Sequence, residues 1–157
     1  MGTGTEPIDG TGLIGIGVDA VEVTRLRQVL ARRPSMAGRL FTEDELAYCT
    51  RATDPIPRLA TRFAAKEATM KALGVGLGAF PFADVEVVRN GLDAPSLVLH
   101  RSALRRAADA GVVRWHLSLT HTGEVAMAMV VAEGRGAEPE GPGGDDAHRS
   151  APAAPKP

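Results

Sequence analysis

Residues 62–74 read RFAAKEATMKALG, and this is the most informative stretch of the chain. Its spacing predicts the last part of a central α-helix over residues 58–73, which Gly74 terminates. At 100° per residue, one face of that helix carries the apolar side chains of Leu59, Phe63, Met70 and Leu73. Glu67 projects about 40° from Phe63, on the rim of this apolar stripe. A carboxylate there needs a cation or a hydrogen-bond donor to compensate it, and metal binding is a common reason to keep one.

The composition of the chain limits the classes of protein to which it can belong. With 157 residues, the chain fits one domain, and 44% apolar and 24% charged residues are ordinary for a globular protein. The formal net charge of −1 argues against nucleic-acid and membrane-surface partners. No apolar run approaches the ~20 residues that span a bilayer, and no secretory signal is recognisable at the N-terminus. The single cysteine, Cys49, cannot form an internal disulfide. These features predict a cytoplasmic location.

The pattern along the chain predicts an α+β fold, with a small antiparallel sheet packed against helices. Strands are expected over residues 13–18, 84–89, 96–99, 115–120 and 124–132, and further helices over 21–31, 42–48 and 101–110. Residues 1–12 are expected to form a loose lead-in and residues 13–133 the domain. Residues 134–157 consist of glycine, proline, alanine and charge, which predicts a disordered tail.

Three polar positions could carry chemistry, and each also has a purely structural interpretation. Asp19 follows the first predicted strand, where it either caps the next helix or binds a ligand. Glu67 and Lys71 lie one helical turn apart, so they either form a surface ion pair or belong to a functional site. His121 lies at the end of a predicted strand, in a polar turn or beside a ligand.

Taken together, these positions predict more than each does alone. Asp19 and Glu67 supply two hard oxygen ligands, which suits Mg²⁺ shared with a substrate phosphate; Mn²⁺ is the alternative metal. The nearby donors for phosphate are Arg62, Lys66, Lys71 and His121, and the backbone at Gly74 and Gly76 can approach a ligand closely. Two acids, several cations and a glycine loop predict metal-assisted chemistry at a phosphate ester or anhydride.

Three segments resemble one known family. They are GIGVDAVEVTRL at residues 15–26, RFAAKEATMKALGVGLG at 62–78 and HLSLTHTGEVAMAMVV at 116–131. They resemble the holo-acyl-carrier-protein synthase type of 4′-phosphopantetheinyl transferase, over about residues 13–133. Such an enzyme transfers the phosphopantetheine arm of coenzyme A to a serine of an apo acyl carrier protein and releases adenosine 3′,5′-bisphosphate. The resemblance therefore implies coenzyme A as co-substrate and a carrier of fatty-acid or polyketide synthesis as partner.

The resemblance also implies roles for individual residues. Asp19 and Glu67 would hold the metal, and Lys71 would lie near the pyrophosphate, so that Glu67 and Lys71 are the expected catalytic residues. The coenzyme A site would be bordered by Arg62, Lys66, Lys71, Gly74, Gly76 and His121. The carrier serine would lose its proton to Glu67 or to a metal-bound water. Val21 stands where larger, pseudo-dimeric relatives carry a second acid, so the chain resembles the short branch, which forms homotrimers with active sites at subunit boundaries.

A candidate docking surface lies on the first predicted helix. Arg25, Val29 and Arg32 follow i, i+4, i+7 spacing, which makes them either a solvated basic face or a surface for the acidic helix of a carrier.

Two other functions of the protein stay open from the sequence. A metal-dependent hydrolase of nucleotide anhydrides would cleave coenzyme A without a carrier. A non-catalytic trimer that binds coenzyme A or a nucleotide would never modify a carrier.

Overall fold

The structure, a computed structural model, describes residues 11–89 and 91–135. Its long strands are β1 (Thr11–Glu22), β4 (Val112–His121) and β5 (Val125–Arg135), and its short strands are β2 (Val85–Val88) and β3 (Ser96–Leu99). The helices are α1 (Val23–Arg32), α2 (Ala37–Leu40), α3 (Glu43–Cys49), α4 (Ile56–Ala72) and α5 (Arg101–Asp109). Two 3₁₀ turns, η2 (Pro34–Met36) and η3 (Phe82–Asp84), complete the described elements.

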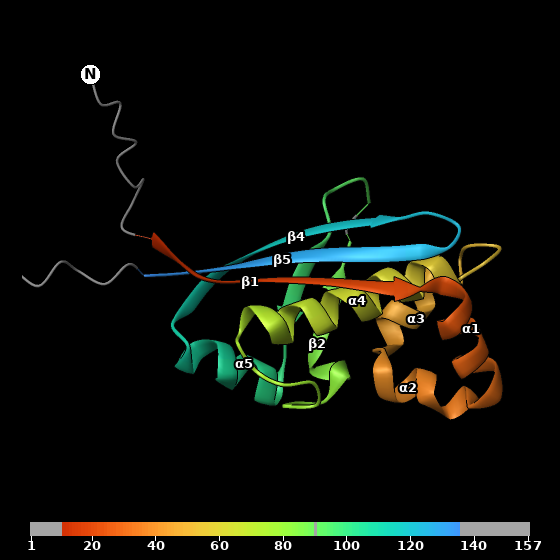
Figure 1. Cartoon of the computed structure of the whole chain (residues 1–157), viewed down its shortest axis with the longest axis horizontal. Helices are drawn as coiled ribbons and strands as arrows, with labels where there is room; N and C mark the ends of the chain where they lie inside the picture. Colours follow the sequence, from red (N-terminus) through yellow and green to blue (C-terminus); the bar gives the residue numbers. More distant parts are fainter. Residues whose placement is uncertain (1–10, 90, 136–157) are drawn as a thin grey trace, which may run out of the picture.

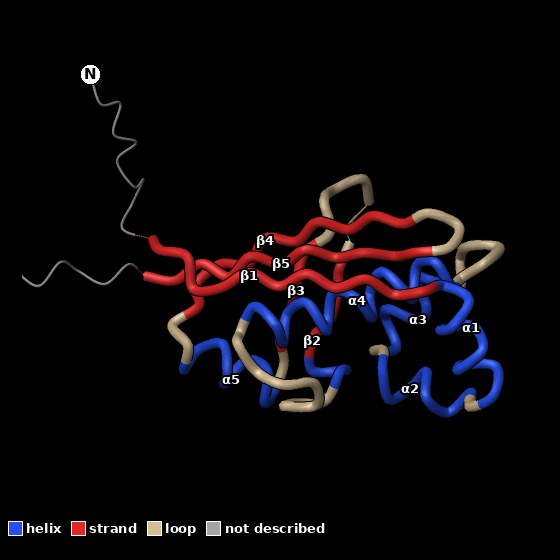
Figure 2. The backbone as a smooth tube through the Cα atoms, viewed as in Figure 1, coloured by secondary structure: helices blue, strands red, loops and turns tan. Residues whose placement is uncertain are grey.

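All strand pairs are antiparallel, which confirms the predicted α+β class. The long strands form a sheet in the order β1-β5-β4, and β2 and β3 form a separate hairpin. The helices gather on one side of the three long strands, with α4 running beneath them (Figures 1 and 2). No helix within the two described ranges is long and apolar enough to cross a membrane.

The long strands extend beyond the predicted limits. β1 continues through Asp19 to Glu22, because each residue from Gly15 onward pairs with β5, and Asp19 lies opposite Ala128. The prediction that Asp19 ends the strand is therefore wrong, and α1 begins at Val23 instead of residue 21. β1 also begins at Thr11, and β5 ends at Arg135, past the expected domain limits of 13 and 133. The predicted tail from residue 136 and the lead-in up to residue 10 lie outside the described residues.

Two glycines let β1 lie directly on α4. A Cβ atom at Gly15 would stand 2.0 Å from the carbonyl oxygen of Ala72, and one at Gly17 would stand 1.8 Å from that of Ala68. Ala68 and Ala72 are themselves buried, so small residues on both elements permit this contact. The sequence predicted that only one apolar face of this helix is buried. The side of α4 that carries the alanines is buried as well, against the sheet, so the predicted face is too narrow.

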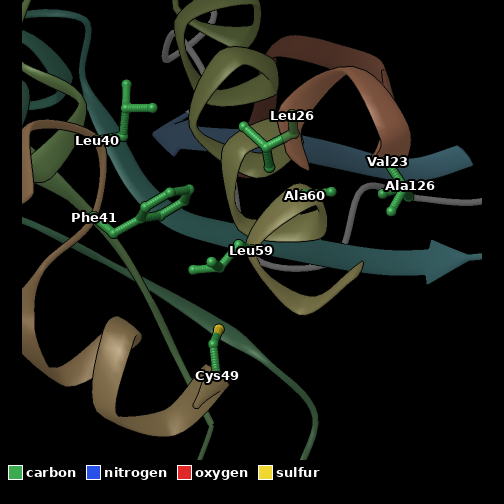
Figure 3. Packing of buried hydrophobic residues seen from close by; sticks show 8 residues of the cluster. All are labelled: Val23, Leu26, Leu40, Phe41, Cys49, Leu59, Ala60 and Ala126. Carbon is green, nitrogen blue, oxygen red and sulfur yellow. The ribbon is translucent and has the colours of Figure 1, made fainter. Parts of the chain in front are cut away.

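The first half of α4 is covered by the preceding helices. Leu59 and Ala60 of α4 pack with Val23 and Leu26 of α1 and with Phe41, as Figure 3 shows. The helix ends as predicted at Gly74, which adopts φ +65. The amide of Gly74 bonds the carbonyl of Lys71, and the next amide bonds that of Met70, each at 3.0 Å, which is a Schellman cap.

Candidate functional site

Asp19, Glu67 and Lys71 come together where β1 crosses α4. Asp19 follows Gly17 by two residues, so its side chain points to the same face of the strand, toward the helix. The Nζ atom of Lys71 lies 2.8 Å from Asp19 Oδ1 and 2.9 Å from the carbonyl oxygen of Val18. We call these three residues the acid cluster.

The acid cluster contains two carboxyl groups and only one ammonium group. Partial burial and the adjacent Asp19 carboxylate raise the pKa of Glu67 from 4.5 to about 7, although the Lys71 ammonium opposes the shift. Among the described residues no nitrogen or hydroxyl donor reaches the buried Asp19 Oδ2, and the Glu67 carboxyl group, when protonated, hydrogen-bonds the Asp19 side chain. Because the two carboxylates repel each other when both are ionised, a cation placed between them would be stabilised.

The acid cluster fits a divalent cation that is shared with a ligand. Mg²⁺ commonly takes one or two carboxylates and leaves its other positions to water and to substrate phosphates. Asp19 Oδ2 and the Glu67 carboxylate are the oxygens available for such an ion. In the described part of the chain, no group of three or more histidine, cysteine, aspartate or glutamate side chains comes together to hold a metal. The described residues thus offer two acids and no complete cage.

Glu67 borders an apolar groove of about 520 Å³, which we call the acid groove. Its lining residues are Ala20, Val21, Glu22, Arg25, Leu26, Val29, Met36, Leu40, Phe63, Glu67 and Phe82. Phe63 and Phe82 stack with ring centroids 5.2 Å apart. Of the predicted docking residues, Arg25 and Val29 line this groove, whereas Arg32 is exposed at the end of α1 and lies outside the lining.

Arg62 and His121 line a second hollow of about 510 Å³, which we call the basic hollow. Its lining residues are Tyr48, Arg58, Thr61, Arg62, Arg89, Pro95, Leu119, Thr120 and His121. The Arg62 guanidinium lies 4.5 Å from the centroid of the Tyr48 ring, and its Nε has no hydrogen-bond partner in the described ranges. Three arginines and a histidine line the hollow and carry the kind of donor that a phosphate group requires. Arg62 is the least exposed of them, at 4%, and its Nη1 donates to the carbonyl oxygen of Arg58 at 3.2 Å.

Two of the three arginines of the basic hollow were not predicted from the sequence. Arg58 lies one turn before Arg62, and this i, i+4 pair of arginines was a usable signal. Both guanidinium groups lie over the Tyr48 ring. Arg89 reaches the hollow from the end of β2, through a tertiary arrangement that no local pattern indicates.

Lys66 does not lie where the resemblance implies. Its side chain is 0% exposed, and its Nζ lies 2.7 Å from Glu45 Oε2. The same Nζ donates to the carbonyl oxygens of Phe82, at 3.0 Å, and of Val85. Burial lowers the pKa of Lys66, and Glu45 opposes that shift. Because its donors are satisfied inside the protein, Lys66 is not available to coenzyme A in this structure, and we assign it no ligand contact.

The two glycines of the predicted loop follow the end of α4. Gly74 and Gly76 are exposed, and a Cβ atom at either would meet nothing within 4 Å. Neither residue lines the acid groove or the basic hollow. The open surroundings leave their backbone accessible to a ligand near Lys71, three residues before Gly74.

Comparison with known proteins decides the family. A model of the 4′-phosphopantetheinyl transferase superfamily matches residues 15–130, a range that includes the acid cluster and the lining of both hollows. The chain belongs to this superfamily. Among curated members, it is 47% identical over 128 residues to the holo-[acyl-carrier-protein] synthase of Anaeromyxobacter dehalogenans, and the match covers 79% of this chain and 98% of that protein.

Solved structures of superfamily members have the same fold. The holo-[acyl-carrier-protein] synthase of Neisseria meningitidis matches with a TM-score of 0.69 and 34% identity, covering 77% of this chain and 98% of that one. A holo-(acyl-carrier-protein) synthase of Bacillus anthracis in complex with CoA (3′,5′-ADP) matches with a TM-score of 0.64 and 32% identity, covering 78% and 97%. The sequence resemblance to the holo-acyl-carrier-protein synthases is thereby confirmed.

Proposed function

We propose that the acid cluster and the two hollows carry out the reaction of the superfamily. That reaction transfers the 4′-phosphopantetheine arm of coenzyme A to an apo acyl carrier protein. The relatives of the chain identify it as an enzyme of this type. The observation that supports the assignment to particular residues is the close approach of the Asp19 and Glu67 carboxyl groups, together with the raised pKa of Glu67, to which partial burial and that approach contribute. Both features are typical of a site built for a cation and a phosphate.

The acid cluster is the proposed reaction centre. Asp19 and Glu67 would hold Mg²⁺ or Mn²⁺, and the bound ion supplies charge neutralisation at the pyrophosphate of coenzyme A. Lys71 is 46% exposed, so its ammonium can turn from Asp19 to the leaving phosphate and stabilise the charge that develops there. The serine oxygen of the carrier would bond the β-phosphorus as the bond from that phosphorus to the bridging oxygen breaks and adenosine 3′,5′-bisphosphate leaves. Glu67 is the proposed acceptor of the serine proton.

The basic hollow is the proposed site for the nucleotide part of coenzyme A. Arg62 and His121 were expected there from the sequence, and Arg58 and Arg89 add two further guanidinium groups. Arginine is suited to phosphate because its planar fork can donate two parallel hydrogen bonds. The exposed backbone at Gly74 and Gly76 would border the same ligand from the end of α4.

The acid groove is the proposed docking surface for the carrier protein. Arg25 at its edge can pair with an acidic helix, and Val29 with the two phenylalanines offers apolar contact beside Glu67. Arg32 lies farther along α1 and would contribute long-range attraction only. A carrier seated here would bring its serine to the acid cluster.

A homotrimer would explain two further features of the chain. The face of the long sheet away from α4 is apolar yet exposed, at Ile16 (54%), Val18 (46%), Met127 (41%) and Met129 (47%). The acid groove and the basic hollow share no lining residue, so one copy could supply the acids and its neighbour the arginines. We therefore infer active sites at subunit boundaries. The cytoplasmic location expected from the sequence stays a prediction.

Removing one acid tests the assignment. Glu67→Gln or Asp19→Asn should lower the rate of carrier modification by about 10²–10³-fold, because each removes a charge at the reaction centre. Circular dichroism should be unchanged. Glu124→Gln serves as the control, since Glu124 is exposed in the β4–β5 turn. A rate within twofold of the parent in either acid variant would refute the proposed centre.

A further inference from the structure

The buried ion pair between Glu45 and Lys66 takes no part in the proposed chemistry. Both side chains are 0% exposed, and the charged atoms lie 2.7 Å apart. Removing two charges from water costs free energy that their attraction often only offsets, so such a pair is a weak source of stability. A use for the pair must therefore be sought in what it holds in place.

The pair bonds the backbone of three neighbouring elements. Glu45 Oε1 accepts from the amide of Val87 in β2 at 3.0 Å, and its Oε2 closes the capping box of α3. Lys66 Nζ donates to the carbonyl oxygen of Phe82 in η3 at 3.0 Å and to that of Val85 in β2. One ion pair thus fixes α3, η3 and β2 against α4.

Phe82 connects this pair to the acid groove. Its ring stacks on Phe63 with centroids 5.2 Å apart and planes inclined by 15°, and both rings line the groove with Glu67. Lys66 directly precedes Glu67 on α4, so it holds η3 to the same turn of helix that carries the acid. The position of the Phe82 carbonyl therefore sets where the aromatic wall stands relative to Glu67.

We propose that Glu45 and Lys66 are positioning residues for the carrier protein: they fix Phe82 and thereby the aromatic wall of the acid groove. This inference rests on the proposed docking of the carrier in that groove. Neither residue touches coenzyme A or the reacting atoms. Their loss should therefore weaken productive binding of the carrier while leaving the binding of coenzyme A unchanged.

The test is steady-state kinetics of the double variant E45Q/K66M. The double change removes both charges together, so neither is left unpaired in the interior, and glutamine keeps an acceptor for the Val87 amide. We expect KM for the apo carrier to rise about tenfold, with kcat and KM for coenzyme A within about twofold of the parent. A loss of structure alone would instead lower the apparent kcat for both substrates together.

Two further variants separate this inference from the docking proposal on which it rests. Phe82→Leu keeps the ion pair but removes the aromatic stack, and it should also raise KM for the carrier. If it does not, the docking proposal fails. If it does while E45Q/K66M leaves that KM unchanged, only the positioning role is overturned. His100→Ala is the matched control, because it removes the 2.8 Å contact between His100 and Glu86 of β2, the strand that Glu45 and Lys66 also bond. Both KM values should stay within about twofold.

Folding is checked by circular dichroism at the assay temperature. If E45Q/K66M is unfolded, E45Q/K66Q takes its place in the same assay, because it also removes both charges and keeps a hydrogen-bond donor at position 66. If both variants are unfolded, the pair is a stability element, and the positioning role is overturned. An equal rise in KM for the carrier and for coenzyme A would also overturn it.

Discussion

The surroundings of Glu67 determine its pKa. It sits four residues after Phe63 on the rim of the acid groove, and the Asp19 carboxylate faces it from the neighbouring strand. Partial burial is the largest cause of its raised pKa of about 7, and the charge of Asp19 adds to it. Glu67 therefore titrates near neutrality in the metal-free protein, and a divalent cation bound beside it would hold it as the carboxylate.

The stability of the metal-free protein should depend on pH through Glu67. Its pKa rises from 4.5 to about 7 on folding, so the folded chain holds the proton more tightly than the unfolded chain. The resulting stability is fully present below pH 4.5 and is lost as the pH rises through about 7. The melting temperature of the parent should therefore fall relative to that of Glu67→Gln across this range, and Mg²⁺ should restore it above pH 7. Parallel curves for the two proteins, unaffected by Mg²⁺, would contradict the pKa assignment.

At the residue scale, the sequence indicated the acid cluster but not the place of Lys66. Glu67 was recognisable because a carboxylate interrupts an apolar stripe, and Lys71 because it follows one turn later. Lys66 looks like another phosphate donor in the sequence, whereas the structure pairs it with Glu45, 21 positions earlier in the chain. A long-range partner of this kind leaves no local pattern, which is why the buried pair could not be predicted.

At the scale of elements, the contact between β1 and α4 builds the site. Gly15 and Gly17 remove the side chains that would hold the strand away from Ala68 and Ala72. The resulting close approach brings Asp19 to Lys71. The sequence predicted both elements, but it ended the strand at Asp19 because local propensity cannot reveal the pairing with β5.

Gly17→Ala should therefore disrupt the fold. The new Cβ would stand 1.8 Å from the carbonyl oxygen of Ala68, and a backbone atom cannot move aside without shifting the helix. Overpacking typically costs about 1–3 kcal/mol of unfolding free energy, and this contact belongs at or above the upper end. Gly38→Ala is the control, because a Cβ there meets nothing within 4 Å. Urea denaturation that gives both variants the stability of the parent would contradict the close packing.

The proposed docking of the carrier on α1 can also be tested. Arg25→Glu should raise KM for the carrier much more than KM for coenzyme A, because it puts an acid where the carrier is expected to be acidic. The effect should shrink as salt screens the repulsion. Arg105→Glu on α5 is a matched exposed arginine outside the acid groove. An equal rise in both KM values for Arg25→Glu would count against docking at this groove.

At the scale of the whole molecule, the sheet has one uncovered apolar face. The strand pairing places Val18 beside Met129 and Ala20 beside Met127, with the helices on the opposite side. The sequence could not predict this exposure, since the alternation along β1 and β5 shows two apolar faces without saying which the helices cover. Trimer formation was expected from the family resemblance alone, and the uncovered face now supplies a candidate surface.

Val18→Asp should prevent that assembly. A charge in the middle of the apolar face would have to be buried on association, at a large desolvation cost. Light scattering should give a trimer for the parent and a monomer for the variant, and carrier modification should fall with it. Val98→Asp, at an exposed valine on the separate β2–β3 hairpin, should leave the assembly intact. A variant at Val18 that keeps the molar mass of the parent would exclude this face as the interface.

We propose that the acid cluster transfers the phosphopantetheine arm with the help of a divalent ion. The most direct measurement is the intact mass of an apo acyl carrier protein after incubation with this protein, coenzyme A and Mg²⁺, beside a chelator control. We predict a gain equal to one phosphopantetheine arm that disappears with the chelator and with Glu67→Gln. A gain that persists under either condition, or no gain with several carriers while the folded protein still binds coenzyme A, would contradict the account.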